Sequence, residues 1–498
     1  MRSSKQPTPA TEAPGSANGE NVAPGRFSTT SLLLALGAVS LVVYVLVLVV
    51  PFSVLEHGGT PLLSMTDLTD RTPAGIAHFL TAFGVPFLLY LVGFLAFGRR
   101  RIPLRLVLAF PVICGGLLIL VYPLTAIDVF LYASQARVLT HYDANPFVVP
   151  PATFTGDPFL QWTIFTDTPT AYGPLWTYLS AIPTMIAGEA PMAAALGIKM
   201  LSLGALVAAV VLTYHIAEGI RSGTGTAAAY LLGWNPVVLW STAGAGHNDI
   251  VMMAFVLLAF FYIQRNALLA VSALVLGALV KFAVLVLVPL FVVYLWRREH
   301  SPRFIGGSLL LAAVIGALVV GPLWEGPGMF SGVGGQVQDL ATMSPGATAI
   351  LFAEWLGLSQ DNADTLVRWL FFGAFALIYA VLLARVRGQP ESLMRHSFWA
   401  LFFVLILVTF WFRFWYVLWL VPLAAITLPV DRKLATLGVI FSGTAILIYG
   451  FTDYFWIWLG FGLSAHIAVM LVVFTPPVVA WCASVALPRL RTRLAFGR

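Results

Sequence analysis

The chain has 498 residues, of which 59% are hydrophobic and only 10% are charged, and its mean hydropathy is +0.91. Soluble domains carry about a quarter of charged residues. These values exclude a soluble protein and predict an all-α, polytopic integral membrane protein. The net charge of +6 does not indicate nucleic acid binding, because the cations gather in short loops beside apolar segments.

The first segment, residues 1–29, is rich in Pro, Ser, Thr, Gly, Asn and Glu. Such a composition cannot bury enough apolar surface to fold, so it predicts a disordered cytoplasmic tail ahead of a transmembrane domain over 30–498. The only two cysteines, Cys114 and Cys482, lie in apolar segments and indicate neither a disulfide nor a metal site. The loops on the cytoplasmic side are too short to hold a nucleotide-binding fold.

Apolar runs long enough to span a bilayer predict about fourteen transmembrane helices. They are expected near residues 31–52, 77–98, 104–123, 192–217, 224–243, 247–264, 266–280, 282–297, 303–323, 365–387, 395–411, 413–429, 433–452 and 464–487.

The orientation of these helices follows from Lys and Arg, which concentrate in loops on the cytoplasmic side. The clusters at 99–105, 297–303, 385–395, 432–433 and 489–493 all lie on that side if the segment 174–188 does not cross. We interpret this segment as an interfacial or re-entrant helix. Both termini are then cytoplasmic, and residues 124–191 form the largest external loop of a multi-pass protein of the cell membrane.

This loop opens at Asp128, where an apolar run ends and the polar stretch AIDVFLYASQARVLTHYDANPFVVPP begins. A carboxylate at a helix end, followed by a long and ordered-looking loop, suits an enzyme that works at one face of the membrane. The alternative interpretation is that Asp128 only caps the helix that follows it.

Further charged and polar residues occur on the same predicted side. They are Lys199, His247, Asn248, Asp249, Lys281 and Arg413. A carboxylate accepts the proton of a hydroxyl, and Lys or Arg stabilises a phosphate as its charge develops. Together they predict transfer of a group from a phosphate-linked lipid to a hydroxyl. Each has an alternative: a solvated turn for His247 and Asp249, snorkelling for the lysines, and an aromatic belt for Arg413. Asp453 lies at the top of a further helix on this side, and for it a position without a chemical role is favoured.

At these residues the chain resembles the GT-C superfamily of polyprenyl-phosphate-sugar-dependent glycosyltransferases. It is most similar to the bacterial polyprenyl-phosphomannose-dependent mannosyltransferases of the lipomannan type. The matching pieces are Asp128-Val-Phe-Leu-Tyr132, Asn145-Pro146-Phe147, Tyr172-Gly173-Pro174-Leu175, Asn235-Pro236, Gly246-His247-Asn248-Asp249, Lys281 at the start of a helix, and Arg413-Phe-Trp-Tyr416.

The resemblance implies a GT-C membrane fold in which Asp128 is the catalytic base of an inverting transfer, with mannose as the expected sugar. The partners are then a polyprenyl-phosphate sugar donor, a glycan or glycolipid acceptor, and membrane lipids. Two sets of residues are expected to assist Asp128. Lys281, Arg413, Lys199 and His247 hold the donor phosphate, whereas Tyr132, Asn145, Tyr172, Asn248 and Asp249 position sugars or shape the loop. The loop lacks an Asp-x-Asp or Glu-x-Asp pair, so the sequence supports no metal site and no cofactor.

Two other functions stay open at this point. A transporter or flippase of lipid-linked sugars also holds charges in the membrane, but the sequence has no internal repeat and no pair of broken helices at corresponding positions of two halves. A non-catalytic assembly factor for envelope glycans would tolerate the loss of Asp128, which separates it from an enzyme.

Overall fold

The computed structural model describes residues 28–97, 102–332, 341–460 and 462–496. Within these ranges the regular secondary structure is helical, and the only β-type pairings are two isolated bridges, Ser53 with Val121 and Thr342 with Trp411. The predicted all-α polytopic class is confirmed. The predicted disordered tail, except for its last two residues, and the arginines at 99–101 lie outside the described residues.

Eight helices in the described ranges are long and apolar enough to cross a membrane, and each lies where a span was expected. They are α1 with the turn that continues it (Thr29–Val49), α4 (Pro73–Phe97), α8 (Pro191–Ile220), α14 with its last turn (Pro302–Leu323), α17 (Gln360–Arg385), α18 with its continuation (Pro390–Val408), the run that starts with α20 (Arg432–Phe455), and the run of α23 and α24 (Leu463–Ala486).

The other six expected spans are shorter or bent. They are α5 (Leu104–Ile119), α9 (Gly225–Gly233), the segment Pro236–Gly244, which bends by 117° into α11 (Asp249–Tyr262), α12 (Ala267–Val280), α13 (Val288–Glu299) and the segment Phe414–Thr427. The interruptions fall at polar residues, namely at 247–249, at Lys281 and at Arg413. Irregular backbone at membrane depth is tolerated where it is buried in protein or lines a cavity. The breaks therefore indicate where a cavity should lie.

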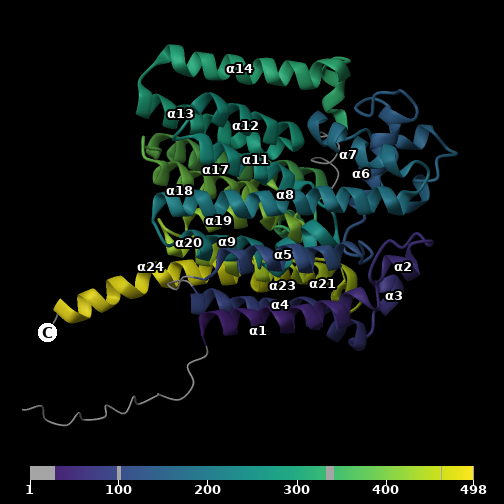
Figure 1. Cartoon of the computed structure of the whole chain (residues 1–498), viewed down its shortest axis with the longest axis horizontal. Helices are drawn as coiled ribbons and strands as arrows, with labels where there is room; N and C mark the ends of the chain where they lie inside the picture. The colour runs from purple at the N-terminus through teal and green to yellow at the C-terminus, as the bar shows by residue number, and fades with distance from the viewer. Residues whose placement is uncertain (1–27, 98–101, 333–340, 461, 497–498) are drawn as a thin grey trace, which may run out of the picture.

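The long helices run side by side, and several short elements gather at one end of the bundle (Figure 1). These elements are α2 (Val54–His57), α3 (Thr66–Thr69), α6 (Asp128–Thr140) and α7 (Pro174–Ala187), and we call this end the loop end. Helix α7 is too short to be a candidate span and packs on α6 and α8. The segment 174–188 thus forms a packed helix of 14 residues, and its interfacial position stays a prediction.

The segment that leads into α7 docks closely on the end of α12. The amide of Gly173 donates to the carbonyl of Val280 over 3.0 Å. A Cβ atom at Gly173 would lie 1.9 Å from the carbonyl oxygen of Leu279, so no other residue fits this contact without moving the backbone. The docking places Tyr172 beside Lys281, the first residue after α12.

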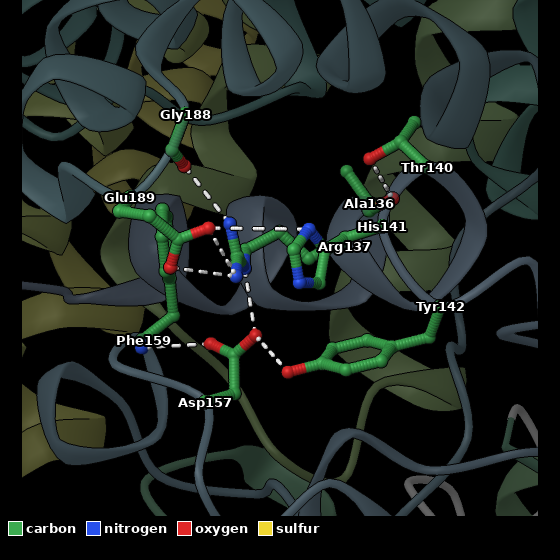
Figure 2. Close-up of polar contacts among 9 residues, drawn as sticks. All are labelled: Ala136, Arg137, Thr140, His141, Tyr142, Asp157, Phe159, Gly188 and Glu189. Carbon is green, nitrogen blue, oxygen red and sulfur yellow. Dashed lines mark hydrogen bonds and ion pairs between the residues drawn. The ribbon is translucent and has the colours of Figure 1, made fainter.

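The loop between α6 and α7 is held to α6 by Arg137, which is almost fully buried (Figure 2). Its Nε donates to Asp157 over 2.7 Å, its Nη1 donates to the carbonyl of Gly188 over 2.9 Å, and its Nη2 donates to both carboxylate oxygens of Glu189 over 3.1 Å. One side chain thus ties α6 to two other stretches of the loop.

Asp157 completes this network from the other side. It accepts hydrogen bonds from the hydroxyl of Tyr142 over 2.9 Å and from the amide of Phe159 over 2.8 Å. The guanidinium of Arg137 lies over the Phe159 ring at 4.6 Å. The guanidinium of Arg137 and the carboxylate of Asp157 both have hydrogen bond partners, so the network holds α6, and hence Asp128 at its start, in one position.

We expect Arg137→Met to destabilise the protein, because it leaves the buried carboxylate of Asp157 without its cation. Removing one partner of a buried ion pair costs about 3–5 kcal/mol. The double variant Arg137→Met/Asp157→Asn should recover part of the loss, since it removes both charges. Thermal unfolding of the purified protein measures both effects. A single variant as stable as the wild type would contradict the role of Arg137, and Arg265→Met, at an exposed arginine, is the control.

Candidate active site

A cavity of about 270 Å³ opens at the loop end, among the residues at which the helices are interrupted. Its polar lining includes Asp128, Tyr172, Lys281, Arg413 and Asp453. These side chains come from the start of α6, the segment before α7, the break after α12, the segment before Phe414–Thr427 and the end of the α20 run. The structure therefore brings together three residues that the sequence singled out for chemistry, Asp128, Lys281 and Arg413.

Asp128 is the first residue of α6, and the residue that caps the helix is Ile127. Asp128 is thus in the first turn of α6 and is not its N-cap residue. Its side chain is 25% exposed and points to the cavity. Burial raises the pKa of Asp128 to about 6, against the influence of the nearby Lys281 and Arg413, which lower it. A carboxylate with such a pKa is ionised at neutral pH and is a better base than an ordinary aspartate.

His247 lies behind Asp128. Its Nδ1 is 3.7 Å from Oδ2 of Asp128, and its ring stacks on Trp415 with centroids 4.1 Å apart and planes inclined by 19°. The side chain is fully buried and does not line the cavity. The sequence predicted a contact with the donor phosphate, whereas the structure places this imidazole against the carboxylate, where it can orient Asp128.

Lys281 enters the cavity from the break between α12 and α13. Its Nζ is 2.7 Å from Oδ1 of Asp249, and the indole of Trp419 donates to the same oxygen over 2.5 Å. Asp249 is fully buried, does not line the cavity and pairs with Lys281. Which of its two expected roles it has, positioning sugars or shaping the loop, stays a prediction. The ammonium also lies 5.8 Å from the ring centroid of Tyr172 and 5.0 Å from that of Tyr416. Such rings favour a cation over their faces.

Arg413 reaches the cavity from another element. Its guanidinium lies over the ring of Trp411 at 4.7 Å and that of Trp415 at 6.0 Å. The strand-like segment before it pairs with Thr342, whose amide donates to the carbonyl of Phe410 over 3.0 Å and whose carbonyl accepts from the amide of Phe412 over 3.2 Å. Within the described ranges, its buried Nε has no hydrogen bond partner. A group in this state is able to donate to an anion in the cavity.

Asp453 also lines the cavity, although the sequence favoured no chemical role for it. Its Oδ1 accepts from the hydroxyl of Ser64 over 2.9 Å, and its Oδ2 accepts from that of Thr452 over 2.8 Å. The α20 run carries this residue to the loop end, against the segment between α2 and α3. The sequence showed only a lone aspartate after an apolar run, and nothing marked its distant partner Ser64.

Two predicted residues have structural contacts away from the cavity lining. Lys199 is buried, and its ammonium donates to the carbonyls of Ile119 and Val121 at the end of α5, over 3.0 and 2.5 Å. The side-chain amide of Asn145 donates to the backbone carbonyl of Leu323 over 2.8 Å and to the carboxylate of Glu325 over 3.0 Å. Asn145 thus shapes the loop, one of the two roles expected for it, whereas the phosphate contact of Lys199 stays a prediction without a cavity position.

The remaining predicted residues surround the cavity at different depths. Tyr172 lines it, and Tyr132 packs edge-on against Tyr172 with centroids 4.9 Å apart. Asn248 is fully buried next to His247 and has no hydrogen bond partner for its side chain in the part of the chain that the structure describes. No group of three His, Cys, Asp or Glu side chains in that part is placed to hold a metal ion.

Comparison with known proteins places the chain in a family. The family model described as alpha-(1->6)-mannopyranosyltransferase, N-terminal domain, matches residues 31–298, more than half of the chain. The chain belongs to the alpha-(1->6)-mannopyranosyltransferase family. The mannosyltransferase resemblance predicted from the sequence is thereby confirmed. The match includes Asp128, His247 and Lys281 and ends before Arg413 and Asp453.

One curated relative is similar to this chain in sequence. The alpha-(1->6)-mannopyranosyltransferase A of Mycobacterium tuberculosis (strain ATCC 25618 / H37Rv) is 23% identical over 312 residues, which cover 58% of this chain and 59% of the relative. The similarity thus spans less than two thirds of either protein.

The raised pKa of Asp128 gives a prediction that needs no substrate. The carboxyl should be protonated below pH about 6 and ionised above it, because burial disfavours the charge. Infrared difference spectra of purified protein between pH 4 and 8 should show the carbonyl band of a protonated acid disappearing around pH 6. Asp128→Asn should lack this component. A midpoint near the ordinary value of about 4 would contradict the prediction.

Proposed function

We propose that the protein is an inverting glycosyltransferase that moves a mannosyl residue from a polyprenyl monophosphate donor to a hydroxyl of a cell-envelope glycan or glycolipid. One observation carries the proposal: a single cavity is lined by a carboxylate with a raised pKa, Asp128, and by two cations from different elements, Lys281 and Arg413. Membership of a mannosyltransferase family supports the choice of sugar.

The reaction assigns one task to each group. Asp128 accepts the proton of the acceptor hydroxyl, whose oxygen forms a bond to the anomeric carbon while the bond from that carbon to the phosphate oxygen breaks. The bonding electrons leave with the phosphate, and Lys281 and Arg413 stabilise the charge that develops on it. Attack opposite to the leaving group inverts the configuration at the anomeric carbon.

The lining of the cavity also fits a lipid-linked donor. Beside the charged groups, it includes the apolar side chains of Leu63, Ile164 and Phe165, all of which are more than a third exposed. An apolar, accessible rim next to two cations suits a ligand with a phosphate at one end and a hydrocarbon chain behind it. A nucleotide sugar has no part that would use this rim.

The proposed orientation points to the same donor. The cationic clusters at 297–303, 385–395 and 432–433 belong to the end of the bundle away from the loop end, and Lys and Arg concentrate on the cytoplasmic side. We therefore assign the loop end to the external face. Nucleotide sugars are absent there, so the sugar has to arrive on a lipid in the outer leaflet.

A transporter of lipid-linked sugars is the second candidate, because one span is bent by 117° between Pro236–Gly244 and α11. Broken helices of this kind form the substrate sites of transporters, but these occur in pairs related by an internal repeat. The described residues contain one such bent pair. A transporter would move the donor without cleaving it, and the transfer assay below separates the two functions.

We expect purified protein to transfer mannose from polyprenyl-phosphate mannose to a mannan acceptor and to ignore the matching nucleotide sugar. Asp128→Asn should lower the turnover by about 10²–10⁴-fold, because it keeps the shape of the side chain but removes the proton acceptor. Asp167→Asn, at an exposed carboxylate of the same loop, is the matched control and should stay active. Release of labelled mannose into product measures the rate. Transfer from the nucleotide sugar, or an active Asp128→Asn variant, would refute the proposal.

Lys281→Gln and Arg413→Gln should each lower turnover by about 10²-fold, because each removes one donor to the leaving phosphate. Lys281→Gln also leaves Asp249 buried without its cation, so its folding has to be controlled. In the double variant Lys281→Gln/Asp249→Asn both charges are gone, and thermal stability should recover while turnover does not. Recovery of turnover in the double variant would show that Lys281 acts only through folding.

A further inference from the structure

A second hollow of about 670 Å³ lies at the end of the bundle opposite to the cavity, and the chemistry proposed above does not use it. Charged side chains dominate its lining. They are Arg297, Arg385, Arg387, Arg395 and Glu391, and His396 lies among them. Four guanidinium groups therefore share one hollow with a single carboxylate.

The connections of the helices place this hollow far from the cavity. Helix α13 begins shortly after Lys281 and ends near Arg297, and α18 begins near Arg395 and continues toward Arg413. Both helices thus run between the cavity and the hollow. Helix α17, which ends at Arg385, has 26 residues and a length of about 39 Å.

Two of the four arginines are engaged with the protein. Arg297 donates to the carbonyls of Val386 and Ala384, and Arg395 donates to the carbonyl of Val430 over 3.3 Å, with its Nε 3.9 Å from a carboxylate oxygen of Asp431. These contacts hold the wall of the hollow in place.

Arg385 and Arg387 make no such contacts with the protein through their side chains in the described ranges. Both side chains are exposed, and no hydrogen bond or ion pair in the described ranges involves their guanidinium groups. Positive charges brought together in this way repel one another, and an anion in the hollow relieves the repulsion. A phosphate offers the oxygens that guanidinium groups bind in pairs.

The face of α17 that leads to Arg385 indicates where this phosphate comes from. Leu377, Val381 and Arg385 are four residues apart and therefore form one stripe along the helix. Leu377 is 73% exposed and Val381 is 46% exposed. An uncovered apolar stripe on a candidate membrane span faces acyl chains, and it ends at the free arginines.

We propose that the hollow is a binding site for the headgroup of an anionic phospholipid. The phosphate binds Arg385 and Arg387, and the acyl chains lie along α17 over Val381 and Leu377. Basic pockets between helices at a membrane surface bind anionic headgroups in this way. The site is independent of the proposed glycosyl transfer.

The test compares lipids with and without net charge on the full-length protein in detergent. Mixed micelles with cardiolipin or phosphatidylglycerol should raise the melting temperature and should remain bound in native mass spectra, whereas phosphatidylcholine should do neither. Arg385→Gln/Arg387→Gln should weaken the apparent lipid affinity at least about tenfold, because each cation near a membrane surface contributes to binding.

Arg303→Gln/Lys433→Gln is the matched control. It removes the same number of exposed cations at the same end of the bundle, but neither residue lines the hollow. This control should bind anionic lipid like the wild type. Melting temperatures without added lipid show whether each variant folds, and the mass spectra count bound lipid independently of stability.

Three results would overturn the proposal. Equal losses in the two double variants would mean that lipid responds only to total charge. An equal response of the wild type to phosphatidylcholine would remove the role of the anion. Saturation by inorganic phosphate alone, with no added effect of lipid, would assign the hollow to a soluble anion.

Discussion

The geometry of the cavity depends on the buried ion pair between Lys281 and Asp249. It joins the first residue of α11 to the break that follows α12, and the indole of Trp419 donates to the same carboxylate oxygen. Three interrupted elements therefore meet at one atom. Each of these interruptions would be unfavourable in lipid, where backbone groups need partners, and the ion pair gives them a common anchor inside the protein.

The sequence was sufficient to predict the membrane class, the family and the principal charged residues of the cavity. An apolar chain leaves few charged positions, and a charge inside or at the end of a membrane helix is costly, so it usually marks a functional site. This is why Asp128, Lys281 and Arg413 stood out, and all three line one cavity.

The contacts that were not predicted all connect residues far apart in the sequence. The partner of Asp453 is Ser64, and the partners of Lys199 are the carbonyls of Ile119 and Val121, so no local pattern distinguishes a cavity residue from a structural one. Hydropathy likewise does not reveal that a run of apolar residues is broken at a polar position. Hydropathy therefore predicted full spans around 224–297, where the structure has short or bent helices.

Helix α5 is shorter than the hydrocarbon layer that it is expected to cross. Its 16 residues give a length of about 24 Å, whereas the apolar part of a bilayer is about 30 Å thick. Its side chains Val112 and Ile113 are exposed, and a bilayer can match such a short apolar helix by thinning beside it. Asp128 follows this helix in the chain. Under the orientation proposed above, the monolayer next to the cavity would be depressed, and a lipid that diffuses into the depression would carry its headgroup toward Lys281 and Arg413.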